Sequence, residues 1–457
     1  MVMSDRIALL RSGELEQVAS PREIYSRPAT AYVADLRAHV PETVTWLVLA
    51  SLFYLVSSYL VFQISKGEAN HSLSLGIAAV AVILRLTVWP LAPALSDDLY
   101  RYRWEGKLQA AGGNPYESRP GDARWASLRD STFPLVVGKD FKAIYGPLIQ
   151  QVELWSYRAV SAVEKDPVRQ VFWFKLPFAL CDLGVIAALW WLLGAHGLPR
   201  ERVLVYAWSP LAIIEFWATG HNDSVVVLLI TLALLSAAKE RWTWAFVALS
   251  LAVAAKIWPV LLFPLFIGWR QGRPLRGYQW WVALPILGLL ALPYRTDVTE
   301  NLRFVSGFMG GWRNNDSLFG ILLGLAKDPY RAKYAAVGIV VVTVLILTFR
   351  RIPLERACLV AIAVMLMVSA NCHPWYLTWL LPLLVLFPVP ALLLWTALAP
   401  LAYSAVISWV TLGEWQGSTP IRWFEYVPVY SLLTGSWLVS RMISRRRSPR
   451  NSAHIAG

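Results

Sequence analysis

Two adjacent carboxylates are the clearest candidates for chemistry in this sequence. Asp97 and Asp98 follow a long apolar run and begin a segment with the pattern of an amphipathic helix that ends at Gly112-Gly113. Helix capping by Ser96 or Asp97 is the simpler explanation, because acids are favoured in the first turn of a helix. Two carboxylates together at a membrane surface exceed what a cap requires, and ionisable groups there are functional candidates. Asp97 and Asp98 are therefore predicted to be catalytic.

Two further polar breaks carry histidine. His221, Asn222 and Asp223 open an apolar run, and His373 lies in another short break. Imidazole can donate a hydrogen bond to a phosphate or a hydroxyl group near neutral pH. Asn222 or Asp223 could instead cap the following helix, and a lone His at the end of a span is often only a structural hydrogen-bonding group. The four residues are predicted to bind substrate, with these structural roles kept as the alternative.

Two basic residues interrupt apolar runs. Lys256 lies between two short runs and precedes Pro259, while Arg85 lies well inside an apolar stretch. Snorkelling to the interface would explain Lys256; a position on the same side as the acids would let its ammonium bind an anionic substrate. An Arg inside a span should face the bundle interior and have a partner. The predicted partners of Arg85 are the two carboxylates or a bound phosphate.

The composition identifies the elements that must position these residues. Of 457 residues, 57% are hydrophobic and 16% charged, and the mean hydropathy is +0.48. Soluble domains carry about 25% charged residues, so a soluble globular protein is excluded. The net charge of +13 could suggest a nucleic-acid partner. In a membrane chain it is better explained by basic loops on the cytoplasmic side, and no nucleic acid is expected.

From Thr43 onward, apolar runs alternate with short polar breaks. At about 20 residues for each crossing, the pattern predicts an all-α, polytopic transmembrane bundle of about 11 to 13 spans. The predicted spans are 43–64, 72–95, 168–194, 203–218, 223–238, 242–255, 257–268, 278–294, 331–349, 355–371, 375–388, 390–410 and 425–442.

The basic residues predict which way the bundle faces. By the positive-inside rule, their clusters should be cytoplasmic, including a basic tail over 443–457. The remaining clusters are Arg350-Arg351 with Arg356, the turn of Arg270, Arg273 and Arg276, and Lys239-Glu240-Arg241. The breaks 96–167, 220–223, 295–330 and 371–375 then lie on the extracytoplasmic face, where the candidate site residues gather.

The first 42 residues do not fit this composition. They include five Arg and six acids but no apolar run long enough to enter a bilayer. Residues 1–36, through Gly13-Glu14-Leu15-Glu16-Gln17 and Pro28-Ala29-Thr30, resemble the C-terminal part of ABC importer ATPase domains. The chain contains no Gly-rich phosphate loop of the Gly-x-x-x-x-Gly-Lys-Ser/Thr type, so no ATPase activity is expected. The segment is interpreted as a fusion remnant or a misassigned start, outside a transmembrane domain over 43–442.

The order of motifs from Asp97 onward resembles that of the GT-C integral-membrane glycosyltransferases. Nearest are the polyprenol-phosphomannose-dependent mannosyltransferases and the GPI mannosyltransferase I family. The motifs are Asp97-Asp98-Leu99-Tyr100-Arg101, Gly113-Asn114-Pro115-Tyr116, Ile144-Tyr145-Gly146-Pro147, Lys256-Ile257-Trp258-Pro259 and His373-Pro374-Trp375-Tyr376. The acids here are adjacent rather than separated by one residue, which departs from the family pattern. The resemblance implies a GT-C fold with extracytoplasmic loop helices, and adds Tyr100, Arg101 and Tyr145 to the predicted substrate-binding residues.

The resemblance also implies a reaction. The enzyme would move a sugar, with mannose the favoured choice, from a polyprenyl-phosphate donor to a lipid or glycan acceptor, with inversion, at the outer face of an inner membrane. A lipid phosphate is already a good leaving group, so a base and positive charge suffice. Asp98 or Asp97 is the predicted base. The pair could alternatively hold a divalent cation such as Mg²⁺ or Mn²⁺, which would move the base role elsewhere.

Two questions stay open at this level. The loop 295–330, with Arg313-Asn314-Asn315-Asp316-Ser317 near its end, could be a lid that binds the acceptor or simply a solvated loop. A transporter or lipid flippase is the alternative function, because Arg85 and Lys256 could line a path through the membrane. Against that alternative, no internal repeat is detectable, and the polar residues gather on one face.

Overall fold

The computed structural model describes residues 7–11, 14–19, 31–64, 70–93, 95–268, 278–294, 313–350, 352–406, 408 and 419–447. Over these residues the chain is a helical bundle, apart from one short hairpin in which β1 (Ile7–Arg11) pairs antiparallel with β2 (Glu14–Ala19). The predicted all-α membrane fold is therefore confirmed, with this hairpin as an exception inside the N-terminal segment.

Four helical segments of the described chain are long and apolar enough to cross a membrane. They cover Pro41–Ile64, His71–Val88, Pro167–Ala195 and Pro329–Phe349. The corresponding helices are α2 (Ala31–Ile64), α3 (His71–Val88), α6 (Pro167–Trp173) with α7 (Leu176–Ala195), and α17 (Pro329–Phe349). α2 begins at Ala31, so the predicted boundary between residues 42 and 43 falls inside this helix.

Other predicted spans appear as shorter helices. The reason is visible in the sequence, since Pro lies within or at the start of many of these runs and interrupts backbone hydrogen bonding. They are α8 (Leu204–Ala207), α9 (Pro210–Ile213), η4 (Ile214–Ala218), α10 (Asp223–Ala238), α11 (Trp242–Ala255), η5 (Trp258–Leu262), α12 (Phe263–Gly268), α13 (Tyr278–Trp281), α14 (Ala283–Ala291), η6 (Leu292–Tyr294), α18 (Leu354–Met367), η7 (Pro374–Trp379), α19 (Leu381–Leu386), α20 (Pro390–Leu398) and η8 (Ala399–Tyr403). The short η3 (Arg200–Val203) precedes α8, and α16 (Leu318–Ala326) is a helix inside the predicted loop 295–330. The last helix, α22 (Thr419–Arg447), has 29 residues and contains the predicted span 425–442.

The centre of the bundle is apolar. α10 packs between α7 and α11, and all three bury Ala, Val, Leu or Phe side chains against one another. Large apolar side chains on the outer faces of α2 and α17, such as Phe53 and Phe349, are exposed. Such exposure is expected where lipid, rather than water, surrounds a helix.

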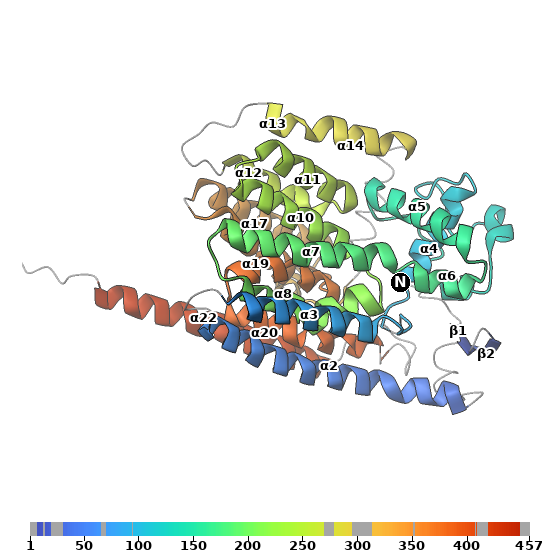
Figure 1. Ribbon diagram of the computed structural model, residues 1–457, viewed down its shortest axis with the longest axis horizontal. Helices are drawn as coiled ribbons and strands as arrows, with labels where there is room; N and C mark the ends of the chain where they lie inside the picture. The colour runs from blue at the N-terminus through green and yellow to red at the C-terminus, as the bar shows by residue number, and fades with distance from the viewer. Residues whose placement is uncertain are drawn as a thin grey trace, which may run out of the picture.

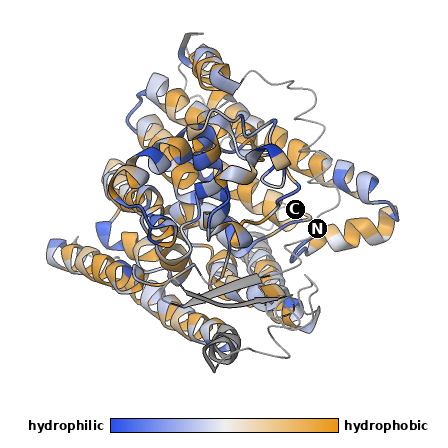
Figure 2. Cartoon of the chain, turned by 90° about the vertical axis from the view of Figure 1, so that its right-hand side faces the viewer, coloured by the Kyte–Doolittle hydropathy of each residue, from blue (hydrophilic) through white to orange (hydrophobic). Residues whose placement is uncertain are grey.

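The long break 96–167 folds into helices at one end of the bundle. These are α4 (Asp98–Ala110), η1 (Ala123–Leu128), η2 (Phe133–Leu135) and α5 (Pro147–Val163). Figure 1 shows α4, α5 and α6 together at the right-hand end, while the C-terminal half of α22 extends from the opposite end. The view onto the α4 end shows hydrophilic segments near its middle, surrounded by hydrophobic helices (Figure 2).

The break that carries Asp98 lies at one end of the bundle, and the C-terminal half of α22 extends from the other end. Which side of a membrane each end faces stays a prediction. Arg270, Arg273 and Arg276 lie outside the described residues, as do Arg295, Asp297, Arg303 and Gly310-Gly311 of the loop 295–330.

Candidate active site

Asp98 is the first residue of α4 and keeps 26% of its side chain exposed. Its backbone N–H donates to Oγ of Ser96 at 3.3 Å, and its Oδ2 lies 3.5 Å from the Tyr102 hydroxyl. Asp97 occupies the N-cap position, but its side chain makes no capping hydrogen bond. Ser96 thus contributes to the cap, and capping does not account for the two carboxylates.

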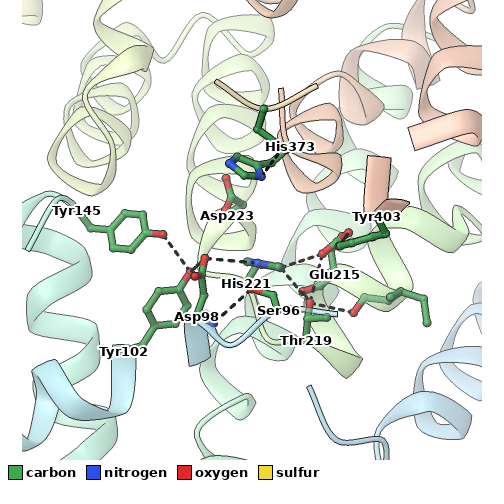
Figure 3. Close-up of polar contacts among 12 residues, drawn as sticks. Ser96, Asp98, Tyr102, Tyr145, Glu215, Thr219, His221, Asp223, His373 and Tyr403 are labelled. Atoms are coloured by element: carbon green, nitrogen blue, oxygen red, sulfur yellow. Dashed lines mark hydrogen bonds and ion pairs between the residues drawn. The ribbon is translucent and has the colours of Figure 1, made fainter. Parts of the chain in front are cut away.

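A tight turn brings a histidine to Asp98. η4 is a π-helix, a form that is rare and often found at functional sites. It is followed by Gly220, whose φ of 73° lies in the left-handed region that glycine adopts at little cost. The turn places Nε2 of the buried His221 at 3.7 Å from Oδ2 of Asp98. Figure 3 shows the imidazole pointing toward this carboxylate from the bundle interior.

The other ring nitrogen of His221 contacts a second acid. Nδ1 lies 2.8 Å from Oε2 of Glu215, a fully buried carboxylate in η4. The Tyr403 hydroxyl, from η8, donates to Oε1 of Glu215 at 2.5 Å. Thr219 donates its hydroxyl proton to the Glu215 carbonyl oxygen at 2.7 Å, and its oxygen lies 2.9 Å from Nδ1 of His221. The imidazole is therefore held between two carboxylates, as Figure 3 shows.

The two predicted histidines share one aromatic stack. The Trp375 ring lies between them, with centroid distances of 4.1 Å to His221 and 4.4 Å to His373. Nδ1 of His373 lies 3.0 Å from the side-chain amide nitrogen of Asn314. The break at 371–375 and the start of the described part of the 313–317 loop thus meet the 220–223 turn.

The predicted lysine lies in an aromatic pocket beside this stack. Nζ of Lys256 is 2.7 Å from Oδ2 of the buried Asp223, whose Oδ1 accepts from Nε1 of Trp379 at 2.8 Å. The ammonium also lies 4.9 Å from the ring centroid of Tyr145 and 5.8 Å from that of Tyr376. A carboxylate and several aromatic rings thus hold the Lys256 ammonium group in place, close enough to Asp98 to act on it electrostatically.

Close backbone packing brings Tyr145 to Lys256. The N–H of Gly146 donates to the Ala255 carbonyl at 2.9 Å, and a Cβ at Gly146 would lie 2.1 Å from the Ala254 carbonyl oxygen. No larger residue fits here without moving one of the two segments. The Tyr145 hydroxyl lies 3.3 Å from that of Tyr102, which connects the lysine to the Asp98 side of the site.

The electrostatics of the acid pair favour a proton-accepting role near neutral pH. Burial, and then the charge of Asp98, raises the pKa of Asp97 to about 7, although Lys139 opposes the rise. Burial also raises the pKa of Asp98 above its ordinary value, while the positive charges of His221 and Lys256 oppose that rise. A base with such a raised pKa is better matched to neutral pH than a solvated aspartate.

The two histidines differ in protonation. Burial alone would lower the pKa of His221, but its hydrogen bond to Glu215 and the charges of Glu215 and Asp98 outweigh burial and raise it. Burial, and then the positive charges of His221 and Lys256, lowers the pKa of His373 to about 3. His373 is therefore a neutral hydrogen-bonding group at physiological pH, whereas His221 favours the charged form.

Arg85 has a different partner from those predicted. Its guanidinium contacts Asp182 of α7, with Nε at 2.5 Å from Oδ2 and Nη2 at 3.3 Å from Oδ1. Tyr206 and Trp217 also donate to this carboxylate, each at 2.8 Å. Both charged side chains are fully buried. The expectation that Arg85 pairs with Asp97, Asp98 or a phosphate was wrong. Its partner is Asp182, a buried acid that the sequence analysis did not place in the site.

Arg101 also differs from its predicted role. Its guanidinium binds Glu105 of the same helix at 2.5 Å and donates to the carbonyls of Gly138 at 2.6 Å and Phe141 at 2.8 Å. These contacts fasten the loop around η2 to α4, so the side chain is used structurally. Tyr100 is half-buried against the hydrophobic core, and its substrate-binding role stays a prediction.

Asn222 is fully buried next to His221, yet neither polar atom of its side chain has a hydrogen-bond partner among the described residues. It occupies the N-cap position of α10 but makes no capping bond. Its predicted alternative as a cap is therefore wrong. A buried amide without partners requires an explanation, and the role of Asn222 in substrate binding stays a prediction.

Several site residues were absent from the sequence prediction. Glu215 was hidden inside a predicted span, although an acid in an apolar run is itself a signal of function. Tyr403 and Trp379 lie within predicted spans, among many other aromatic residues, and had no distinguishing signal. Within the described residues, no three His, Cys, Asp or Glu side chains are grouped as metal ligands.

Known proteins resemble the part of the chain that carries Asp98, His221 and Lys256. A family model described as "Alpha-(1->6)-mannopyranosyltransferase, N-terminal domain" matches residues 8–272. The chain is 27% identical over 188 residues to alpha-(1->6)-mannopyranosyltransferase A of Corynebacterium glutamicum, covering 39% of this chain and 35% of that protein. The match thus spans about a third of the relative's length. No solved structure matches the chain.

The N-terminal resemblance is also confirmed. Over 34 residues, 7% of each chain, it is 59% identical to a spermidine/putrescine import ATP-binding protein of Frankia alni. Over 35 residues, 8% of this chain and 10% of the relative, it is 54% identical to one from Pseudomonas aeruginosa. These matches are short, whereas the family model covers more than half of the chain. The protein therefore belongs to the alpha-(1→6)-mannopyranosyltransferase family.

Proposed function

We propose that the protein is a membrane mannosyltransferase that moves mannose from a polyprenyl-phosphate donor to a lipid or glycan acceptor on the extracytoplasmic side, with inversion. The family name suggests an α-(1→6) linkage in the product. The observation that carries the proposal is the partly exposed carboxylate of Asp98 beside the ammonium group of Lys256 at one end of an apolar bundle.

The reaction requires few groups. The C1–O bond between mannose and the lipid phosphate breaks, and the phosphate leaves with the bonding electrons. An acceptor hydroxyl forms a new bond to C1 from the opposite side, and its proton passes to the Asp98 carboxylate. An oxocarbenium-like transition state favours late proton transfer to such a base.

Lys256 is the candidate residue that would stabilise the negative charge of the departing phosphate. Its ammonium is buried among aromatic rings, where electrostatic attraction is stronger than in water. His221 lies on the other side of Asp98. The outer faces of α2, α3 and α17 expose apolar side chains to the bilayer. The donor's lipid chain would stay in the bilayer beside these faces, and the donor would enter the site laterally.

A transfer assay tests this proposal. Membranes containing the protein are supplied with radiolabelled polyprenyl-phosphate mannose and a mannoside acceptor. Asp98→Asn should lower transfer by about 10²- to 10⁴-fold, the usual contribution of a general base. Glu117→Gln, at an exposed acid of the same extracytoplasmic segment, is the matched control and should retain activity. Unchanged transfer by both Asp98→Asn and Asp97→Asn, at equal expression, would contradict the catalytic assignment.

A second arm of the assay tests the metal. Membranes treated with EDTA should retain full transfer if the acids act only as a base. Loss of transfer that Mg²⁺ or Mn²⁺ restores would assign the acid pair to a cation instead and move the base role to another residue.

A further inference from the structure

The imidazole of His221 has two carboxylates at its two nitrogens, and only one of them reaches the surface. Asp98, near Nε2, keeps 26% of its side chain exposed, whereas Glu215, near Nδ1, has none of its side chain exposed. The histidine itself is 1% exposed. Substrate can therefore reach Asp98 but neither of the two residues behind it.

The contacts around Glu215 determine which nitrogen of His221 carries a proton. Oε1 of Glu215 accepts from Tyr403 and Oε2 faces Nδ1 of His221. A carboxylate oxygen can only accept a hydrogen bond, and the shortest contact of the Thr219 hydroxyl is to the Glu215 carbonyl at 2.7 Å, which leaves the Thr219 oxygen available to accept from Nδ1. Nδ1 must therefore be a donor, and Nε2 is the nitrogen that faces Asp98.

The ring is also held in place. Trp375 stacks on one face of His221, with an interplanar angle of 20°. Nε2 is buried and has no hydrogen-bond partner in the part of the chain that the structure describes, while the Asp98 oxygen lies 3.7 Å away, slightly beyond hydrogen-bond distance. A buried nitrogen without a hydrogen-bond partner costs folding free energy unless a nearby group can interact with it.

We propose that Glu215 is a positioning residue that acts on Asp98 through His221. Resting on the proposed function above, this inference gives His221 a role different from direct substrate contact. Glu215 fixes the ring with Nδ1–H bound and keeps a cationic Nε2–H directed at Asp98. The carboxylate is thereby held ionised and oriented until the acceptor hydroxyl delivers its proton.

Protons and charges balance in each step of the reaction under this arrangement. The acceptor proton moves to Asp98, the sugar changes oxygen from phosphate to acceptor, and His221 keeps its own protons. Glu215 compensates the charge of the imidazolium throughout, since a buried cation without a counter-ion would lose its proton. The charged and titratable groups that face this pair from neighbouring elements are Asp97, Tyr102, Tyr145, Asp223, Lys256, His373 and Tyr403.

A titration without substrate tests the inference independently of the reaction. The purified protein, labelled at histidine with ¹⁵N, is titrated by NMR, and His221→Gln assigns the signal. The His221 pKa should lie above the usual value of about 6.5 and fall in both Asp98→Asn and Glu215→Gln. Asp98 is partly exposed, so its variant should fold even if the Glu215 variant does not. An ordinary or lower pKa in the wild type, or no change in Asp98→Asn, would overturn the inference.

Steady-state kinetics supply the second readout. Glu215→Gln should lower kcat by about 10- to 100-fold, less than the loss in Asp98→Asn, with little change in the donor KM. The acidic limb of its pH profile should move to higher pH, because Asp98 loses the neighbouring cation. A loss of activity with an unmoved limb would indicate a merely structural role and overturn the inference.

The chain offers a matched control for the removal of a buried acid. Glu355 also contacts a histidine, with Oε1 at 2.9 Å from Nε2 of His196, and its side chain is 6% exposed. His196 follows the far end of α7, and a 20-residue helix is about 30 Å long. Glu355→Gln should leave kcat and the pH profile unchanged. If the wild type transfers no mannose while the NMR result holds, the proposed function fails and the charge arrangement stands.

Discussion

Oε2 of Glu215 lies 2.8 Å from Nδ1 of His221, and neither side chain is more than 1% exposed. The two residues belong to one π-helical turn and the break that follows it, so the pair forms locally. The orientation of the ring depends on a residue distant in sequence, because stacking on Trp375 holds the imidazole with Nε2 toward Asp98. The pair therefore connects the buried interior to Asp98, a partly exposed acid that substrate can reach.

The rate of transfer should depend on pH through Asp98. A carboxylate whose pKa is raised accepts a proton more readily, so activity should be present at neutral pH and lost as pH falls through that raised value. Asp97→Asn removes a like charge and should move the acidic limb to lower pH. Initial transfer rates across the acidic and neutral range check this. An acidic limb that moves to higher pH in Asp97→Asn would contradict the predicted electrostatic coupling between Asp97 and Asp98.

Lys256 should contribute to both donor binding and stability. Lys256→Met leaves the buried Asp223 carboxylate without its cation, which should cost about 3–5 kcal/mol in the free energy of unfolding. The donor KM should rise in the protein that remains folded. Adding Asp223→Asn should restore much of the thermal stability but not the donor KM. If the double variant regains wild-type KM, Lys256 has no role in binding the donor.

The ion pair of Arg85 and Asp182 should affect folding rather than chemistry. Arg85→Met leaves a fully buried carboxylate unpaired, with an expected loss of about 3–5 kcal/mol. The folded fraction should keep wild-type kcat/KM. Thermal unfolding in detergent, together with activity per folded molecule, separates the two effects. A fall in kcat/KM without a fall in Tm would contradict this prediction and indicate that Arg85 acts in the active site.

Gly146→Ala should disturb the site through the backbone. The new Cβ would clash with the Ala254 carbonyl oxygen, which should cost about 1–3 kcal/mol. It should also raise the donor KM, because Tyr145 and Lys256 lie on the two segments that would separate. Gly76 provides the matched control. It is an exposed helical position with nothing within 4 Å, and its change to Ala should stabilise the protein by up to about 1 kcal/mol. Equal effects of the two substitutions on Tm and KM would contradict the prediction.

Much of the site could be predicted from hydropathy alone. Asp98, His221 and Lys256 each interrupt or flank apolar runs, and the alternation of runs places these interruptions on one side of the membrane. Helix ends at one side of a bundle lie close together, so residues there meet irrespective of their separation in sequence. The same reasoning found His373, which contacts the same Trp375 ring as His221.

Hydropathy by itself thus determined that the chain is a membrane helical bundle and which residues stand at its polar end. Only the tertiary structure decided their partners. Arg85 met Asp182, 97 residues away, and Tyr403 met Glu215, 188 residues away. A hydropathy pattern records where a polar group is expensive to bury but not which donor lies opposite which acceptor. That choice depends on how helices pack, and here it placed a hidden glutamate behind the histidine that faces the predicted base.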